Sequence, residues 1–516
     1  MATQTFTINT VLPGWGTSEY FYKQGQFLNS LGIDPEMPAT TSSTKPSGLI
    51  RPTAMEKFSA SEITGVPMWM ETNNKNTNTY VYASDGKVHV VDEDLAMDTP
   101  VTTITSSSGN GLVYYNNYLY LAKDADVARY GPLSNSPSVV QNFWTSTLSL
   151  TPLQNKTYPV IKGVEMPNHS MFVHPKNNRL YFCDVDANNI GIVSMIKTKK
   201  STYEGEIDDT VVPSAYKVLD FYYNLYPTTL CNLGTELVVG LINGTNTDIK
   251  QGNAQVAFWS TLASDTLYNR IVTLPDPLIT ALKNVNGVLY AFTGNASGGM
   301  RLSRYIGGET FEELYYSDDQ APPLAGAVDY MINRIVWGAS TTTPATSACV
   351  MAIGSRIRDL GMGVQNILKS TSGGTTPLVT ALKYVTLGAN AQPIIGWSDG
   401  TGKGLDKVST AYKTNIWRSQ VFSLGRNGQI KRIRIPFAQE IAANMTLTVK
   451  LYLDDGSSNT TVKVISNTTH SGKRDVVLYP NGVNFKNNFY LELTWSGSAL
   501  LTVATPITLD VNYSDE

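Results

Sequence analysis

The stretch Asn117-Tyr-Leu-Tyr-Leu-Ala122 is one copy of a short pattern in which a turn residue precedes alternating apolar and aromatic positions. The pattern recurs as Asn178-Arg-Leu-Tyr-Phe-Cys183, as Gly287-Val-Leu-Tyr-Ala-Phe292 and as Asn333-Arg-Ile-Val-Trp337. Alternation with period two after Gly or Asn predicts a half-buried strand that leaves a tight turn. The repetition of such strands along residues 80–397 makes an internal repeat the first question about the fold.

The spacing of the copies favours a β-propeller. Their central apolar residues follow one another at roughly 45–60 residues, close to the length of a four-stranded blade. These central residues are Leu119, Leu180, Leu237, Leu289, Ile335 and Ile394. Val88 precedes Leu119 by only 31 residues (119 − 88), so either the first blade is small or these two markers share one sheet. We expect six or seven blades and prefer seven. A large irregular β-sandwich protein is the alternative.

Composition supports an all-β chain and limits its partners. Charged residues make up 16% of the 516 residues, against roughly 25% in ordinary soluble domains. Thr, Asn, Ser and 28 Tyr residues supply the polarity, and Thr and Tyr favour strands. A net charge of −3 argues against a dedicated nucleic-acid binder, which usually carries a basic excess, so no sequence-specific nucleic acid is expected as a partner.

The cysteines and the apolar runs exclude several further classes. Cys183, Cys231 and Cys349 are an odd number without a Cys-x-x-Cys pair, which argues against a disulfide framework and a cysteine zinc site. Residues 1–8 lack the basic and apolar regions of a signal peptide, and no run of 18 apolar residues occurs. We therefore expect synthesis in the cytoplasm and no membrane span.

Three regions are predicted: an extended N-terminal arm over residues 1–65, a β-propeller over 66–410 and a jelly-roll-like β-sandwich over 411–516. Five prolines keep the first region extended. Closure of the propeller ring would pair the last strands, around 379–397, with early strands such as Thr79–Ala83, which removes exposed sheet edges.

The aromatic residues of the arm need a place of burial. They are Trp15, Tyr20, Phe21 and Tyr22. Packing against the outside of the propeller and reaching into a neighbouring subunit are both open, and we take these four residues as candidate assembly contacts.

The last region contains long, evenly spaced strands. They are predicted at Ile430–Phe437, Met445–Leu453, Thr460–Ile465, Arg474–Leu478, Phe489–Trp495 and Leu500–Val511. In the first of these, alternation places Arg432 and Arg434 on one face, opposite Ile433 and Ile435. The simple interpretation is that these two arginines lie on a face exposed to solvent. The functional interpretation is that they anchor an acidic neighbouring molecule, since Arg binds carboxylates bidentately. These two arginines and Trp417 complete the candidate assembly contacts.

Residues for catalysis or metal binding are sparse. His169 and His174 lack further ligands at zinc-site spacing, so we expect both in exposed loops. Asp184-Val-Asp-Ala-Asn188 begins like a calcium loop, but Asn189 and Met195 replace the required glycine and acid. A hairpin turn is the preferred interpretation, with a weak calcium site as the alternative. We predict no cofactor, no metal and no enzyme activity.

A glycoside hydrolase would need two converging carboxylates. Asp184, Asp220 and Glu236 occur at strand-like positions, but nothing singles out a pair.

An arm, a divergent propeller and a terminal sandwich, all low in charge and rich in Thr, Asn and Tyr, resemble a virion protein of tailed bacteriophages. The organisation is similar to that of the β-propeller tail nozzle or hub proteins of short-tailed phages, also called packaged-DNA stabilisation proteins. Those chains end in a stretch resembling the one from Gly425-Arg426 through Leu453 here. The resemblance implies a ring of identical subunits that extends the tail conduit, a virion location, and other tail proteins as partners.

The leading hypothesis is therefore a non-enzymatic virion component, in the tail, that acts through oligomeric assembly as a conduit or in adhesion. The first alternative is a propeller that binds a host-surface glycan, as a lectin or a tail-tip receptor binder, with Tyr and Trp stacking on sugars. The second is a propeller-type glycoside hydrolase.

Overall fold

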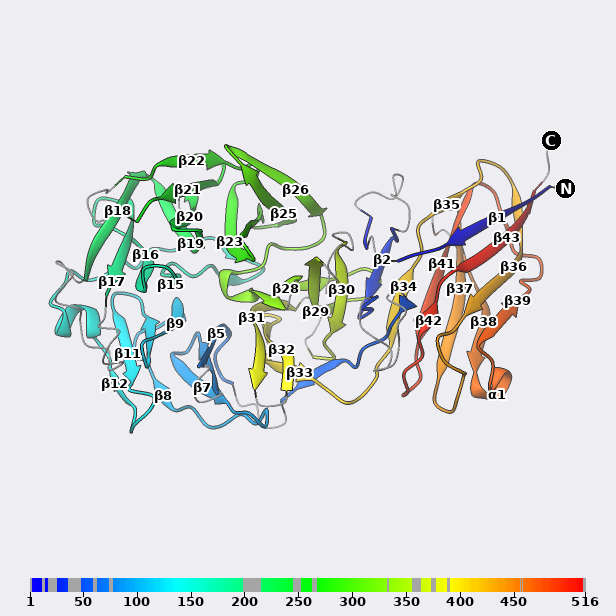
Figure 1. The fold of residues 1–516 in the computed structure, drawn as a ribbon, viewed down its shortest axis with the longest axis horizontal. Helices are drawn as coiled ribbons and strands as arrows, with labels where there is room; N and C mark the ends of the chain where they lie inside the picture. The colour runs from blue at the N-terminus through cyan, green and yellow to red at the C-terminus, as the bar shows by residue number, and fades with distance from the viewer. Residues whose placement is uncertain are drawn as a thin grey trace.

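The structure is a computed structural model. It describes residues 2–11, 14–16, 26–35, 48–58, 63–73, 78–197, 215–244, 252–261, 267–331, 334–354, 363–372, 377–387, 390–454, 456 and 458–513. Strands dominate throughout (Figure 1). Among the residues just given, the helical segments are short: η1 (Phe143–Thr147), η3 (Ala325–Ala327) and α1 (Asn467–His470). The prediction of an all-β chain is confirmed.

Seven four-stranded antiparallel sheets follow one another along the middle of the chain. The first three are β5 (Pro67–Asn73), β6 (Asn78–Ala83), β7 (Lys87–Val91) and β8 (Thr102–Thr103); β9 (Gly111–Tyr115), β10 (Tyr118–Ala122), β11 (Val127–Gly131) and β12 (Ser138–Val140); and β15 (Met171–His174), β16 (Arg179–Val185), β17 (Ile190–Ile196) and β18 (Ala215–Tyr223). The fourth and fifth are β19 (Leu225–Leu233), β20 (Glu236–Asn243), β21 (Gln255–Trp259) and β22 (Arg270–Thr273); and β23 (Leu278–Val285), β24 (Val288–Asn295), β25 (Gly298–Gly307) and β26 (Thr310–Ser317). The sixth and seventh are β27 (Val328–Met331), β28 (Arg334–Thr341), β29 (Ser347–Gly354) and β30 (Gln365–Lys369); and β31 (Leu378–Leu387), β32 (Asn390–Ser398), β33 (Lys403–Val408) and β4 (Met55–Lys57).

These sheets surround one axis. One edge strand of each sheet contributes residues to the wall of a single cavity of about 350 Å³. We call these edge strands the first strands of their sheets; they are β5, β9, β15, β19, β23, β27 and β31. Neighbouring first strands contact one another around the ring, and β31 contacts β5. Radial sheets around a common axis are the arrangement of a β-propeller (Figure 1), so the predicted propeller fold is confirmed.

Ring closure differs from the prediction. The seventh sheet takes its outer strand from β4, whose residues Met55–Lys57 pair with Asp406–Val408 of β33. Thr79–Ala83 belongs instead to β6, inside the first sheet, so the predicted pairing of this stretch with the last strands is wrong. The strand that closes the ring comes from the region predicted to be an extended arm. Three residues are too few for an alternating pattern to be recognised in the sequence.

The short interval between Val88 and Leu119 also has a structural explanation. Val88 lies in β7, the third strand of the first sheet, whereas Leu119 lies in β10, the second strand of the second sheet. The two markers therefore neither share a sheet nor define a small one. They occupy non-equivalent positions in successive sheets.

Contacts between adjacent sheets depend on small residues near the axis. Thr228 and Thr380 are the extra residues at β-bulges of β19 and β31. The Thr228 hydroxyl donates to the carbonyl of Ile279 in the next sheet (2.8 Å), and that of Thr380 donates to the carbonyl of Pro67 in the first sheet (2.5 Å). At Gly338, a Cβ would lie 2.1 Å from Cγ1 of Val379, so only glycine lets the sixth and seventh sheets approach this closely.

Two further sheets pack face to face at the C-terminal side of the propeller; we call them the two-sheet unit. One contains β1 (Ala2–Ile8), β43 (Ile507–Tyr513), β36 (Gly428–Pro436), β39 (Asp475–Leu478) and β40 (Asn484–Phe485). The other contains β2 (Asn29–Leu31), β34 (Asn415–Arg418), β35 (Phe422–Ser423), β41 (Asn488–Trp495), β37 (Thr446–Leu453) and β38 (Ser458–Ser466). Two shorter pairs are β3 (Gly48–Leu49) with β42 (Val503–Ala504), and β13 (Val160–Ile161) with β14 (Val164–Glu165).

Inward-facing aliphatic side chains of both sheets, among them Ile433, Val449, Leu491 and Leu509, form one buried cluster. The strand predicted over 500–511 is two strands, β42 and β43. Pro506, which has no N–H for a ladder, lies between them.

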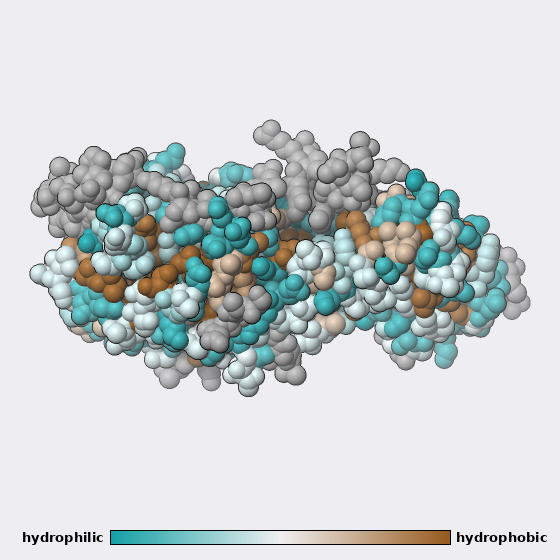
Figure 2. Space-filling model, turned by 90° about the horizontal axis from the view of Figure 1, so that it is seen from below, coloured by the Kyte–Doolittle hydropathy of each residue, from teal (hydrophilic) through white to brown (hydrophobic). Residues whose placement is uncertain are grey.

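Residues 2–58, the N-terminal segment, supply strands to both parts of the molecule. β1 pairs with β43 and β2 pairs with β34 in the two-sheet unit, whereas β4 belongs to the propeller. The buried cluster of the two-sheet unit continues through this segment into the fifth and sixth propeller sheets. The propeller and the two-sheet unit thus form one elongated body, whose visible face is largely hydrophilic with small hydrophobic patches (Figure 2).

Candidate functional site

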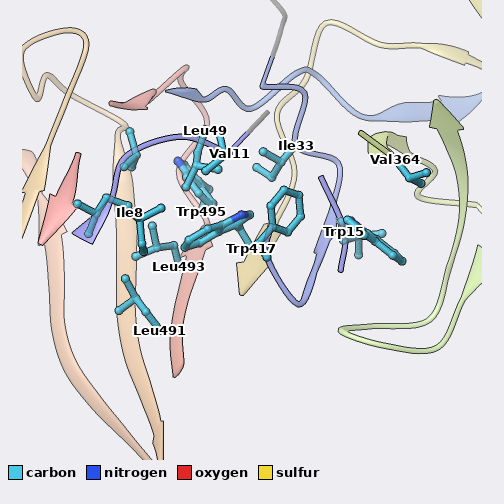
Figure 3. Close-up of a cluster of buried hydrophobic side chains, with 14 of the residues drawn as sticks. Ile8, Val11, Trp15, Ile33, Leu49, Val364, Trp417, Leu491, Leu493 and Trp495 are labelled. Atoms are coloured by element: carbon cyan, nitrogen blue, oxygen red, sulfur yellow. The ribbon is translucent and has the colours of Figure 1, made fainter. Parts of the chain in front are cut away.

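The two tryptophans predicted as assembly contacts lie inside the chain. Trp417 in β34 has no exposed surface, and its ring centroid lies 5.8 Å from that of Phe27. Trp15 is 9% exposed, and its indole Nε1 donates to the Ser30 hydroxyl (3.0 Å). Figure 3 shows Trp417 within the cluster and Trp15 at its edge, toward Val364. Neither side chain is available to another subunit unless it leaves this core.

The other predicted contacts divide into two groups. Tyr20, Phe21 and Tyr22 lie outside the described residues. Arg432 and Arg434 are exposed on β36, while Ile433 and Ile435 are buried, as the alternation predicted. Each arginine forms an ion pair on its own sheet: Arg432 Nη2 lies 2.6 Å from Asp510 Oδ2, and Arg434 Nη2 lies 2.5 Å from Asp475 Oδ2.

The junction between the propeller and the two-sheet unit contains buried charge. Arg334, at the start of β28, and Asp34, in the N-terminal segment, form an ion pair of 3.0 Å between Nη1 and Oδ2. The two side chains are 0% and 3% exposed. A buried pair of this kind requires close geometry, because both charges have left water. It fixes the N-terminal segment against the sixth sheet.

Arg51 joins the same junction through uncharged partners. Its guanidinium donates to the carbonyl oxygens of Lys413 (2.6 Å) and Gly497 (2.5 Å) and to Asn415 Oδ1 (3.1 Å). Burial lowers the pKa of Arg51 to about 10, with a smaller opposing influence from Tyr412. This side chain connects the N-terminal segment with the linker before β34 and with the turn after β41.

The axial cavity of the propeller carries a row of alternating charges. Lys283, Asp329, Lys383 and Glu71 come from four successive first strands, β23, β27, β31 and β5. Lys283 Nζ lies 2.9 Å from Asp329 Oδ1, and Lys383 Nζ lies 3.1 Å from Glu71 Oε2. The first strands of the second, third and fourth sheets contribute mainly apolar residues to the same wall, such as Val113, Val173 and Leu230.

Each charge in this row is balanced by its neighbours. Burial would raise the pKa of Asp329, but Lys283 and Lys383 outweigh it and lower the pKa. Burial would lower the pKa of Lys383, but Glu71 and Asp329 raise it. The backbone N–H of Tyr384 also donates to Asp329 Oδ2 (2.9 Å). Asp329 and Lys383 are therefore each held as ions by their neighbours in the row, which is a structural use of charge.

A near-repeat in the sequence, which the alternation pattern does not single out, marks two lysines of this row. Leu278-Ile-Thr-Ala-Leu-Lys283 and Leu378-Val-Thr-Ala-Leu-Lys383 differ at one position and form the first strands of the fifth and seventh sheets. Both end on a lysine of the axial cavity.

The predicted calcium loop and its histidine neighbour have other roles. Asp186 Oδ1 accepts from the backbone N–H groups of Asn188 and Ile190, as in the preferred hairpin turn. Asp184 is buried in β16, where its Oδ1 accepts from the Gln154 N–H (3.1 Å) and lies 3.7 Å from His169 Nδ1. Burial raises the pKa of Asp184 to about 6, with His169 opposing the shift.

The prediction that His169 and His174 are exposed is wrong, because both are fully buried. His169 Nδ1 contacts the Cys183 carbonyl (2.9 Å), and His174 Nε2 contacts the Glu236 carbonyl (3.3 Å). Cys183, whose carbonyl His169 contacts, is also buried.

The acids considered for hydrolysis each have a partner within the chain. Asp220 pairs with Lys217 (2.9 Å), and Glu236 pairs with Arg270 (2.9 Å), while Asp184 lies in the interior of the third sheet. Within the described residues, no three or more His, Cys, Asp or Glu side chains gather as a metal site would need. In the same part of the chain, no helix has the length and apolar character for crossing a membrane.

Comparisons with known proteins extend to the fold only. No family model matches the sequence, and no curated protein is recognisably similar to it. The β-propeller domain of Cps50 (Swd1) from Myceliophteria thermophila is similar in structure, with 11% identity and a TM-score of 0.42 over 68% of this chain and 99% of that chain. The Dos1 propeller has 10% identity and a TM-score of 0.39 over 74% of this chain and 95% of that chain. At such scores, the sheet arrangement itself remains the basis for the propeller fold.

Proposed function

We propose that the chain is a non-enzymatic structural component of a bacteriophage virion, located in the tail, that acts through oligomeric assembly. The junction carries this proposal. One N-terminal segment supplies strands to both parts of the molecule and is held there by Arg51 and by the buried Asp34–Arg334 pair. A subunit that extends a conduit needs its parts in a fixed relation, and this arrangement supplies it.

The proposal includes a finer account of the fold. Each of the seven four-stranded sheets is one blade, which gives a seven-bladed propeller, and the two-sheet unit is a jelly-roll-like β-sandwich. The DNA conduit would lie between subunits of a ring, since the axial cavity of one propeller is small and is lined by paired charges. Partners would be copies of the same chain and other tail proteins.

Native mass and particle content test the proposal. Light scattering and negative-stain microscopy of the purified chain should show a closed ring with an axial hole, and a tagged copy should be found in purified phage particles. A chain that stays monomeric at high concentration and is absent from particles would contradict the proposal.

Point variants locate the assembly contact better than truncation. Removal of residues 2–58 would take four strands from their sheets and unfold the chain for reasons unrelated to assembly. Arg432→Ala with Arg434→Ala changes only exposed side chains. We expect this double variant to fold normally and to lose the ring, and a matched change at exposed Lys431→Ala to retain it.

A further inference from the structure

The axial cavity of the propeller has charged groups that a small molecule can reach. The side chains of Lys283, Lys383 and Glu71 belong to its wall and are between 23% and 27% exposed. The volume of about 350 Å³ is within the roughly 300–1,000 Å³ that small-molecule sites occupy. The row of charges is therefore paired within the chain but still accessible from the cavity.

This pairing leaves hydrogen-bonding capacity unused. A lysine ammonium carries three N–H donors, and each oxygen of a carboxylate accepts hydrogen bonds. Within the described residues, Lys283 Nζ donates once, to Asp329 Oδ1, and Lys383 Nζ donates once, to Glu71 Oε2. Two donors on each ammonium (3 − 1) and the second oxygen of Glu71 are thus available to a ligand. Both oxygens of Asp329 already have partners, since the Tyr384 N–H binds the other one.

The other arc of the cavity wall offers apolar surface. The charged row comes from β23, β27, β31 and β5, whereas β9, β15 and β19 complete the ring of first strands. Tyr114, Phe172 and Val173 belong to this second arc and are partly exposed. A molecule in the cavity would therefore meet charges on one side and apolar or aromatic groups on the other.

Charge balance in the cavity favours a ligand of one class. The row contains two cations and two anions, so its charges sum to zero. A ligand with a net charge would carry an unbalanced charge out of water, which is costly. An uncharged apolar ligand would displace water from the ammonium donors without replacing its hydrogen bonds. A zwitterion avoids both costs.

We propose that the axial cavity binds a zwitterion with an apolar side chain, in the class of the α-amino acids. The carboxylate of the ligand accepts from Lys383, and its ammonium donates to Glu71 Oε1. Both charged groups of an α-amino acid are attached to one carbon, which matches the adjacent positions of Lys383 Nζ and Glu71 Oε2, 3.1 Å apart. The apolar side chain contacts the arc of Tyr114 and Phe172. This inference does not depend on the virion proposal.

Calorimetric titration of the full chain with defined ligands tests the site. We expect binding of leucine and phenylalanine at millimolar concentration. N-acetyl-leucine, which lacks the ammonium, and leucinamide, which lacks the carboxylate, should each bind about tenfold or more weakly, because a charge-assisted hydrogen bond is lost.

Two variants separate recognition from a structural role of the row. Glu71→Gln gives the row a net positive charge, so N-acetyl-leucine should bind this variant at least as well as leucine does. Glu236→Gln is the matched control: Glu236 is 25% exposed, pairs with Arg270 at 2.9 Å and lies outside the cavity wall, so this variant should keep the wild-type preference. Val173→Trp fills the cavity from its apolar arc without changing a charge, and it should abolish binding.

Three results would overturn the proposal. The first is no binding of either amino acid, and the second is equal binding of leucine and its two blocked forms. The third is an unchanged preference for leucine in Glu71→Gln, with a Tm that shows the variant to be folded. This third result does not require Val173→Trp to fold.

Discussion

The junction and the outer face of the two-sheet unit use arginine in opposite ways. At the junction, Arg334 and Arg51 are fully buried, and each connects the N-terminal segment with another part of the chain. On the outer face, Arg432 and Arg434 are about half exposed and pair with acids of adjacent strands. The difference implies that changes at the junction alter stability, whereas changes on the outer face alter interactions with other molecules.

Trp417→Ala should have the largest effect on stability. The side chain has no exposed surface, and truncation of a buried tryptophan costs about 3–5 kcal/mol. Chemical denaturation followed by fluorescence or circular dichroism measures this loss. Ile416→Ala, at the half-buried neighbouring position of the same strand, serves as the control and should cost clearly less. Equal losses for the two variants would contradict the placement of Trp417 at the centre of the core.

Asp34→Asn should cause the next largest loss of stability. The amide still accepts a hydrogen bond, but Arg334 loses its counter-charge in a buried place, and we expect a loss of about 3 kcal/mol. The double variant Asp34→Leu with Arg334→Met removes both charges and should recover much of this loss. A double variant that is less stable than Asp34→Asn would show that the pair contributes net stability.

Asp184 extends the comparison to a buried acid that faces no arginine or lysine in an ion pair and lies 3.7 Å from His169 Nδ1. Its pKa is about 6 in the folded chain, against about 3.9 in the unfolded one. The unfolded state therefore ionises first as pH rises, so the free energy of unfolding should fall between pH 4 and 6, by up to about 3 kcal/mol. Asp184→Asn should remove this part of the pH profile, and parallel profiles for the two proteins would contradict the assignment.

Arg434→Ala should have the smallest effect on stability. Its guanidinium pairs with Asp475 in water, where ion pairs contribute little, so Tm should stay within the error of measurement. Any loss of ring formation by this variant, seen in its native mass, would then be a direct effect on assembly.

Much of the fold could be predicted from the alternating residue pattern of the strands, because this pattern reflects which side chains of a strand are buried. The copies at Asn117, Asn178 and Gly287 precede β10, β16 and β24, each the second strand of a sheet. Second strands are buried on both sides by neighbouring strands and adjacent sheets, so their apolar and aromatic content is high. β4 could not be predicted, because its place is set by the edge of β33 and not by its own residues.

The candidate sites were harder to predict, because their residues meet only in the folded chain. Asp34 and Arg334 are 300 positions apart, and neither lies in a recognisable motif. Trp15 and Trp417 are large aromatic residues, and this alone does not distinguish a residue of the core from one that contacts another subunit. The two lysines of the axial cavity could have been predicted as a related pair, since the near-repeat that ends at Lys283 and Lys383 is visible in the sequence.

The course of the N-terminal segment has a consequence for biosynthesis. β4 pairs with β33 and β1 pairs with β43, so these two strands find their partners only after residues 403–408 and 507–513 have been made. Until then their edges are open to other chains. Slow translation of residues 403–513 would prolong this interval, and a chaperone that covers residues 2–58 would protect the yield of folded protein.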